Sequence, residues 1–244
     1  MQTVELLRVF KDAIVRAFSY RSDVDPFHAM DVLAEANRRR ANGAPMISMA
    51  VGQPADPAPH QVREAAQRAL IDGNIGYTDA LGLMPLREAI AAHYATQYGV
   101  EVSPKRIAVT TGSSAAFNLA FLVYFDPGDR VAITRPGYPA YRNILKALGV
   151  EVVEIGTGTG ENASLTAEAL IAAHEEKPLK GVLFASPANP TGAIIADDEL
   201  KAILSAAKER NIQALCNTLM RAHSIFRQYH PANTPAGHAI IFRK

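Results

Sequence analysis

The sequence has no tryptophan and only one cysteine, Cys216, among its 244 residues. A single cysteine can form neither an internal disulfide nor a cysteine-based zinc site, so we expect no metal centre and a cytoplasmic location. Cys216 lies in an apolar run, which favours a buried thiol over a nucleophile.

Long apolar runs and an excess of one charge are also missing. No stretch reaches membrane-spanning length, and charged residues interrupt residues 1–20, so we expect neither a membrane association nor a secretory signal. Lys and Arg number 25 and Asp and Glu 24, a formal net charge of +1, which gives no case for nucleic-acid binding. The only basic run, Arg38–Arg40, closes a helical pattern and is interpreted as a solvated helix end.

Strand and helix patterns alternate from residue 106 to residue 216. This alternation predicts an α/β fold with three layers, α/β/α, around a mostly parallel sheet. The expected strands are 106–111, 130–134, 151–155, 180–185 and 212–216, and the expected helices between them are 113–125, 139–148, 166–173 and 197–210.

The two ends of the chain differ from this middle part. Helical spacing of apolar residues occurs within 1–20, 28–41, 61–72 and 85–99. After Cys216 neither a helical nor a strand period is clear, and no acidic residue occurs. We therefore divide the chain into an N-terminal helical arm (1–50), a large domain (51–216) and a tail (217–244).

Three loops follow expected strands and carry residues suited to a ligand, and we expect all three to lie at one edge of the same sheet. The loop Gly112-Ser113-Ser114 precedes a helix, where backbone N–H groups favour a phosphate, although Ser113 or Ser114 could instead cap the helix. Tyr138 follows the next strand and offers a ring for stacking. Asn189 lies in SPANPTG (186–192), which is either a rigid ligand-binding turn or a purely structural one.

Together these stretches resemble the class I/II aminotransferases, the fold type I pyridoxal-phosphate enzymes. The resemblance covers residues 22 to 216 almost continuously. The matching stretches are SDVDPFHAMDVL (22–33), GQPADPAP (52–59), GYTDALGLMPLREAIAAHY (76–94), VTTGSSAAF (109–117), DPGDRVAITRPGYPAYRNIL (126–145) and ASPANPTG (185–192).

The resemblance implies that 51–216 binds pyridoxal 5′-phosphate. By this resemblance, Gly112, Ser113 and Ser114 cradle its phosphate, Tyr138 stacks on its pyridine ring, and Asn189 hydrogen-bonds its ring oxygen O3′. The peptide bond that follows Asn189 is expected to be cis, as in the family.

The resemblance also implies a substrate and a partner. Gly52 matches the glycine that helps to hold the substrate carboxylate, and Tyr77 matches the tyrosine that reaches the phosphate of the neighbouring subunit. The implied assembly is a homodimer with shared sites. The implied substrates are an amino acid and a 2-oxo acid, as in amino-acid biosynthesis.

The sequence departs from the family after the strand 212–216. The family continues with Asp-Glu-x-Tyr, whose Asp pairs with the pyridine nitrogen, but here the residues are Asn217, Thr218, Leu219 and Met220. The family's Ser-x-x-Lys motif, with its Schiff-base lysine, has no match, because no lysine occurs between Lys208 and Lys244. We assign no catalytic residue and hypothesise that 217–244 is a frameshifted or fused tail on a truncated aminotransferase.

The function implied by the resemblance is amino-group transfer, but without the lysine we expect this chain to be inactive alone. One alternative is a non-catalytic remnant or a dimerising binding module. Another is a different reaction of the same fold, such as a decarboxylase, C–S lyase or amino-acid synthase. The family's sheet has seven strands and this chain supplies about five, so the strand 212–216 is expected to form an exposed edge.

Overall fold

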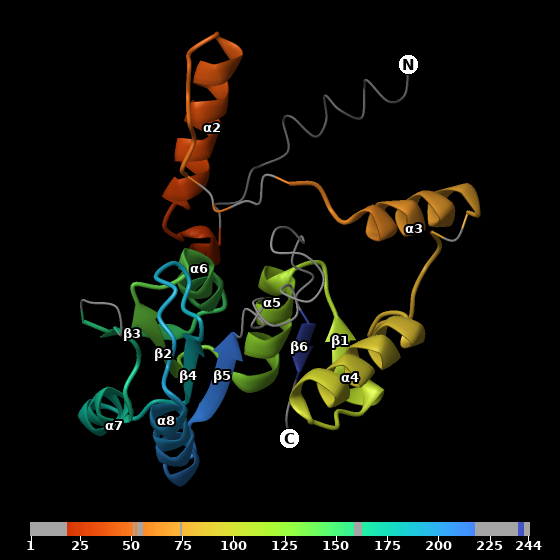
Figure 1. Ribbon diagram of the computed structural model, residues 1–244. Coiled ribbons are helices and arrows are strands. Elements are labelled where there is room, and N and C mark those ends of the chain that lie inside the picture. Colours follow the sequence, from red (N-terminus) through yellow and green to blue (C-terminus); the bar gives the residue numbers. More distant parts are fainter. Residues whose placement is uncertain are drawn as a thin grey trace, which may run out of the picture.

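The computed structural model describes residues 19–50, 52, 56–73, 75–158, 163–217 and 239–241. Its centre is a four-stranded sheet in the order β3-β2-β4-β5, in which every neighbouring pair is parallel (Figure 1). The predicted α/β fold with a mostly parallel sheet is confirmed. The strands are β2 (Arg130–Arg135), β3 (Glu151–Gly156), β4 (Gly181–Ala185) and β5 (Gln213–Asn217).

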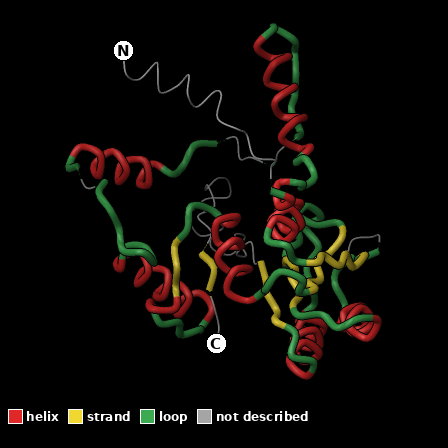
Figure 2. The backbone as a smooth tube through the Cα atoms, turned by 180° about the vertical axis from the view of Figure 1, so that it is seen from behind, coloured by secondary structure: helices red, strands yellow, loops and turns green. Residues whose placement is uncertain are grey.

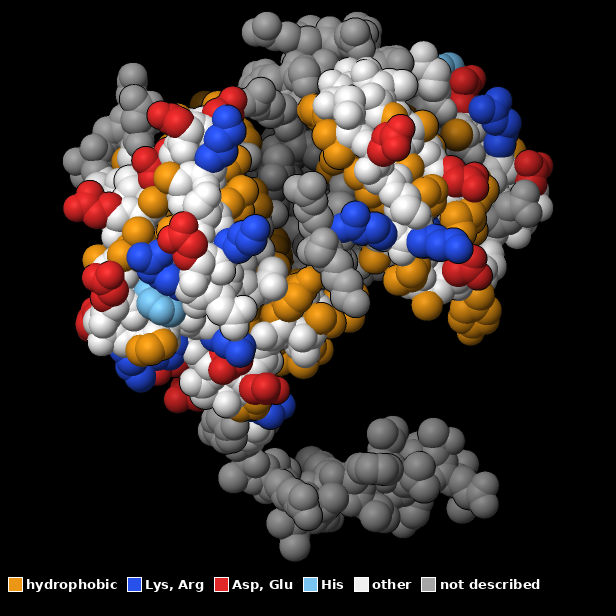
Figure 3. All heavy atoms as spheres, turned by 90° about the horizontal axis from the view of Figure 1, so that it is seen from below, with side chains coloured by type: hydrophobic (Ala, Val, Ile, Leu, Met, Phe, Trp, Pro, Cys, Tyr) orange, Lys and Arg blue, Asp and Glu red, His pale blue; other side chains and the backbone are white. Residues whose placement is uncertain are grey.

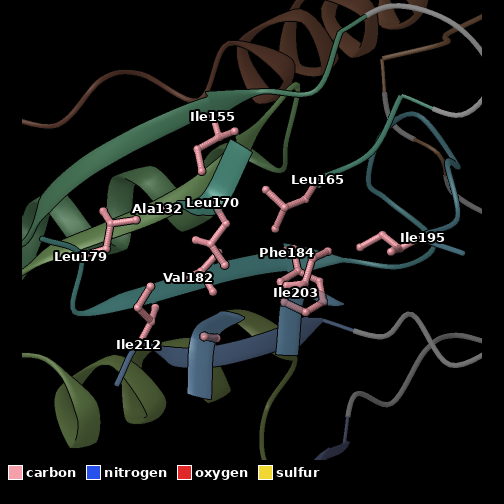
Figure 4. Packing of buried hydrophobic residues seen from close by; sticks show 11 residues of the cluster. Ala132, Ile155, Leu165, Leu170, Leu179, Val182, Phe184, Ile195, Ile203 and Ile212 are labelled. Carbon is pink, nitrogen blue, oxygen red and sulfur yellow. The ribbon is translucent and has the colours of Figure 1, made fainter. Parts of the chain in front are cut away.

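Helices cover both faces of this sheet. α5 (Ser113–Tyr124) and α6 (Pro139–Ala147) contribute to one buried apolar cluster, and α7 (Ala167–Glu176) and α8 (Asp197–Glu209) to the other. The side chains of β4 alternate between the two: Val182 and Phe184 join the α7 and α8 cluster (Figure 4), whereas Leu183 joins the α5 and α6 cluster. This alternation follows from the period of two in a strand.

The strand expected at 106–111 is shorter than predicted and lies outside the parallel sheet. β1 (Ile107–Val109) pairs antiparallel with β6 (Ala239–Ile241), a strand that the tail pattern did not predict. Only a three-residue loop joins β1 to α5, and α5 packs on the sheet. β1 is therefore held beside the parallel sheet by its connection to α5, and not by hydrogen bonds to a strand of that sheet.

The N-terminal helices have little buried surface. α2 (His28–Ala41) buries only Ala36, and α3 (His60–Ile71) buries no residue. Figure 2 shows both helices extending away from the sheet. At the end of α2, Arg38 and Arg39 are exposed and pair with Glu35, which confirms a solvated helix end. The helix expected within residues 1–20 lies outside the described residues, apart from the start of the 3₁₀ turn η1 (Tyr20–Ser22).

α4 (Met84–Tyr98) is joined to β1 by a buried arginine. The Nε atom of Arg87 donates to the carbonyl oxygens of Pro104, in the 3₁₀ turn η2 (Pro104–Arg106), and Ile107, at 3.0 and 2.9 Å. Through these two hydrogen bonds the Arg87 side chain connects α4 to the turn and the strand that follow it.

Two sequence expectations concern the edge strand β5. It forms one edge of the parallel sheet, as predicted. The prediction of a buried Cys216 is wrong, because this residue is exposed. It lies next to the end of a strand with only one neighbour in the sheet, so fewer side chains surround it than surround its partner Phe184 on β4.

The described residues contain neither a helix able to span a membrane nor a cluster of metal-binding side chains. None of their helices combines the length and apolar character that crossing a membrane requires. No group of three His, Cys, Asp or Glu side chains is placed to hold a metal within this part of the chain. On the face shown in Figure 3, basic and acidic side chains are interspersed among apolar ones.

Candidate functional site

The site is built at the carboxyl edge of the parallel sheet. β2, β4 and β5 are consecutive in the sheet, so the residues after them meet at one edge. Tyr138 follows β2, Asn189 follows β4, and Asn217 is the last residue of β5. The sequence prediction that Tyr138 and Asn189 share an edge is therefore consistent with the strand order.

Tyr138 lies on a tight connection between β2 and α6. Gly137 is required there, because a Cβ atom on it would come within 2.4 Å of the Thr134 carbonyl oxygen. Tyr138 is the N-cap residue of α6 and is partly buried. Its ring meets Tyr141 at 5.4 Å and 82°, and Phe27 at 5.8 Å and 73°. Both contacts are nearly perpendicular, so both are edge-type contacts and neither ring is stacked parallel to Tyr138.

Tyr141 is the residue at which several elements meet. It is only 2% exposed, and its ring contacts Phe117 of α5 at 4.9 Å. The Nδ2 atom of Asn217 donates to its Oη atom at 2.5 Å. Burial raises the pKa of Tyr141 to about 12, although the Asn217 hydrogen bond acts in the opposite direction. The hydroxyl therefore keeps its proton at neutral pH.

Sequence analysis did not identify Tyr141 as a site residue. The signal that could have found it is its spacing from Tyr138, since residues three apart on a helix lie on the same face. The partner of Asn217 could not have been inferred, because the two residues are 76 positions apart.

The turn after β4 is held by its own hydrogen bonds. The Ala188 N–H donates to the Ala193 carbonyl at 2.8 Å, and the Ser186 hydroxyl oxygen accepts from the Ile195 N–H at 3.1 Å. The Asn189–Pro190 peptide is cis, as predicted. Asn189 is partly buried, and among the described residues its side chain makes no hydrogen bond. Its amide is thus held on a rigid turn with donor and acceptor capacity unused.

A small cavity beside this turn does not suit a flat ring. It measures about 10 Å³, which is room for a single water. Most of its lining residues are apolar, and four carry hydroxyls: Thr134, Thr157, Ser164 and Thr191.

Gly112 and the two serines lie at the start of α5, but not as an N-cap by serine. Gly112 itself is the N-cap, with φ of 91° and ψ of 168°, and Ser113 and Ser114 are the first two helical residues. The serine-cap alternative is therefore wrong. Within the described part of the chain, no side chain caps the first N–H groups of α5. These donors remain available to an anion.

The expectation that Gly112 follows a strand of the same sheet is also wrong, since β1 lies outside it. The start of α5 is instead linked to the edge through Phe117, which contacts Tyr141. Figure 1 shows α5 beginning at the end of the molecule toward which β5 points. The uncapped N–H groups of α5 and the aromatic residues Tyr138 and Tyr141 thus lie at one end of the fold.

Gly52 and Tyr77 are not joined to this edge by any contact within the described residues. Gly52 is exposed, and a Cβ atom on it would meet nothing within 4 Å. Tyr77 is fully exposed on the loop between α3 and α4. Its ring projects away from its own chain, so this chain alone does not bring it to the site.

The described lysines lie away from the carboxyl edge. Lys180 precedes β4 at the opposite end of the sheet, Lys105 lies in η2 directly before β1, and Lys146 of α6 pairs with Asp25 at 2.9 Å. Lys177 pairs with Glu151, while Lys201 and Lys208 are on α8. Thr218, Leu219 and Met220 lie outside the described residues.

Comparisons with known proteins identify a family. The family model "Aminotransferase class I and II" matches residues 44–221. A valine–pyruvate aminotransferase of Mycobacterium tuberculosis is 46% identical over 217 residues, covering 88% of this chain and 55% of the relative. An aspartate aminotransferase of Thermotoga maritima is 34% identical, covering 78% of this chain and 50% of the relative. The chain spans about half the length of these relatives.

Solved structures give the same result for the fold. An aminotransferase from Mycobacterium tuberculosis superposes with a TM-score of 0.78 at 46% identity, covering 83% of this chain and 52% of the other. The aspartate aminotransferase of Thermus thermophilus, solved with maleate, has a TM-score of 0.78 at 31% identity and covers 84% and 54%.

Proposed function

The chain belongs to the class I and II aminotransferase family, and we propose that it forms the cofactor-holding half of an aminotransferase site. In this proposal the chain binds pyridoxal 5′-phosphate without a covalent bond. The observation that carries the proposal is the position of Tyr138 and Asn189, which follow neighbouring parallel strands. The first makes edge-type and not stacked aromatic contacts within the described residues, and the second has an unused amide.

Each part of the cofactor has a matching group in this proposal. The uncapped N–H groups and hydroxyls of Ser113 and Ser114 receive the phosphate, because a helix N-terminus favours an anion. Tyr138 stacks on the pyridine ring, and Asn189 donates to the ring oxygen O3′. When bound, the cofactor supplies the electron sink through which an amino group passes between an amino acid and a 2-oxo acid.

Two requirements for amino-group transfer are not met by the described residues. A covalent tether needs a lysine amine at the edge, and the described lysines lie elsewhere. Protonation of the pyridine nitrogen needs a carboxylate, whereas Asn217 is neutral and donates to Tyr141. The amine would also move the proton during transfer. We therefore expect the chain by itself to bind the cofactor weakly and to transfer no amino group.

An absorbance titration of the purified chain with pyridoxal 5′-phosphate tests this proposal. We expect reversible binding that dialysis removes, and no near-visible band that borohydride bleaches. Tyr138→Ala and Asn189→Ala should each weaken binding, whereas the matched controls Tyr98→Ala and Asn37→Ala on α4 and α2 should not. A lysine-linked band, or binding unaffected by both site variants, would contradict the proposal.

The substrates and the assembly are also proposals. With a relative named for valine and pyruvate, we propose an amino acid and a 2-oxo acid as substrates, with that pair tested first in any reconstituted enzyme. The exposed Tyr77 supports a homodimer in which each subunit contributes a tyrosine to the other's phosphate site. A biosynthetic role and a cytoplasmic location stay predictions.

The alternative of a non-catalytic, dimerising binding module is not favoured, since the compared relatives are named aminotransferases. Such a module would dimerise but bind no cofactor. Light scattering measures the dimer, and the absorbance titration described above measures the binding that separates the two functions. A decarboxylase or C–S lyase is not favoured, since the compared relatives are named aminotransferases.

A further inference from the structure

Residues 19–27, which we call the strap, cross over α6 ahead of α2. The strap includes η1 and ends at Phe27, the N-cap residue of α2. Figure 1 shows η1, at the red start of the described chain, lying against α6. This segment is not part of the sheet, and the site described above includes only its last residue, Phe27.

Two polar contacts fasten the strap to α6. The Nζ atom of Lys146 lies 2.9 Å from the Oδ2 atom of Asp25, and the Nδ2 atom of Asn143 donates to the Asp25 carbonyl oxygen at 2.9 Å. One contact uses the side chain and the other the backbone of the same strap residue. Asp25 is therefore held at two points on one helix, two residues before Phe27.

The strap delivers Phe27 to Tyr138. The two ring centroids are 5.8 Å apart with an interplanar angle of 73°, an edge-type contact. On α6, Tyr141 makes a second edge-type contact with Tyr138 at 5.4 Å and 82°. Tyr138 thus has aromatic neighbours from two separate segments, and Phe27 is the one that α6 itself does not supply.

We propose that Phe27 is a positioning residue for Tyr138, and that the strap sets the plane of the Tyr138 ring for a flat aromatic ligand. The proposal rests on the proposed function, in which Tyr138 stacks on the cofactor ring. Without Phe27, the Tyr138 ring loses its aromatic contact on the strap side. The ring then samples orientations that cannot stack on the ligand. Chains with the ring in those orientations do not bind, so the measured affinity falls.

The size of the effect follows from the kind of contact. Loss of an aromatic edge contact changes an equilibrium constant by about 2- to 10-fold. The Lys146–Asp25 pair is largely exposed, so breaking it alone should have a smaller effect, of about twofold or less. Phe27 therefore makes the larger contribution, and Asp25 fixes where it sits.

The experiment measures ring order and cofactor binding separately. A chain with 3-fluorotyrosine only at position 138 is prepared with Phe27→Ala, Phe27→Tyr and the control Met30→Ala, an exposed residue on the first turn of α2. ¹⁹F NMR of the cofactor-free chain reports the order of the ring, and absorbance titration with pyridoxal 5′-phosphate reports affinity. Urea unfolding shows whether each variant retains its fold.

We expect Phe27→Ala to shift and broaden the ¹⁹F resonance and to weaken cofactor binding about 2- to 10-fold. Phe27→Tyr should restore both signals, and Met30→Ala should change neither. An unchanged resonance in a folded Phe27→Ala chain overturns the proposal. A wild-type chain that binds no cofactor overturns the proposed function and the cofactor role of the strap, whatever the resonance shows. If Phe27→Ala does not fold, the partial truncation Phe27→Leu is measured in its place with the same criteria.

Discussion

Tyr141 shows how one residue can connect a site to the stability of the fold. It is buried, contacts the rings of Phe117 and Tyr138, and accepts a hydrogen bond from Asn217. Since an ionised phenol at this place would lie among apolar side chains, burial favours the neutral form. The burial of Tyr141 should therefore affect folding stability, which can be measured without any ligand.

We predict that Tyr141 makes folding stability depend on pH above about 10. The folded pKa of Tyr141 is about 12, against 10.0 as its ordinary value, so the unfolded chain loses this proton first as pH rises. Its contribution is full below pH 10 and is lost between about 10 and 12. Two pKa units correspond to about 2 to 3 kcal/mol.

Urea unfolding of the wild-type chain and Tyr141→Phe at pH 8, 10 and 11.5 checks this prediction. The difference between the two chains isolates Tyr141 from the lysines and other tyrosines that titrate in the same range. The wild-type free energy of unfolding should fall more steeply than that of the variant. Parallel pH curves for the two chains would show that Tyr141 is not responsible.

At the scale of elements, the start of α5 depends on a glycine. Gly112 has φ of 91° and ψ of 168°, a conformation that is essentially restricted to glycine. A Cβ atom on Gly112 would meet nothing within 4 Å, so any cost of a side chain there comes from the backbone alone. This backbone turn points the first N–H groups of α5 outward.

Gly112→Ala is expected to lower the free energy of unfolding by about 1 to 3 kcal/mol. Gly156→Ala is the matched control, because Gly156 has no positive φ and equally open surroundings. Its effect should stay within about 0.5 kcal/mol. Urea unfolding by circular dichroism measures both, and equal losses in the two variants would refute the backbone explanation.

At the scale of the whole molecule, the sheet has a well-packed core, but the N-terminal part and α5 leave large apolar side chains exposed. Ile47 and Met49 are each 92% exposed, and Leu122 and Val123 of α5 are 64% and 71% exposed. Large exposed apolar surface marks an interaction site. Together with Tyr77, this surface is the physical basis for the proposed homodimer.

We predict that the double variant Leu122→Lys, Val123→Lys reduces self-association. Charges on the exposed face of α5 should prevent its burial against a second chain without disturbing the α5 residues in the core. Leu204→Lys on α8, on the opposite face of the sheet, is the control. Light scattering across a concentration series should show fewer dimers for the double variant only; equal dimerisation of all three chains would place the interface elsewhere.

Much of the fold could be predicted because its signals are local. Strand and helix patterns located β2 to β5 and the helices between them within a few residues, and the proline-rich turn indicated the cis Asn189–Pro190 bond by resemblance. The exposure of Cys216 was missed, because burial on a strand depends on how many neighbours the strand has. The separation of β1 from the sheet was missed for a related reason, since strand pairing depends on distant segments.

The sequence by itself determined the alternation of elements, the family and the residues placed after each strand. Only the tertiary structure decided which of these residues meet. Asn217 reaches Tyr141, and Phe27 reaches Tyr138 across 111 positions, because the strap and β5 are brought to α6 by packing. Contacts of this kind arise from non-local burial and side-chain geometry, which no local pattern of residues records.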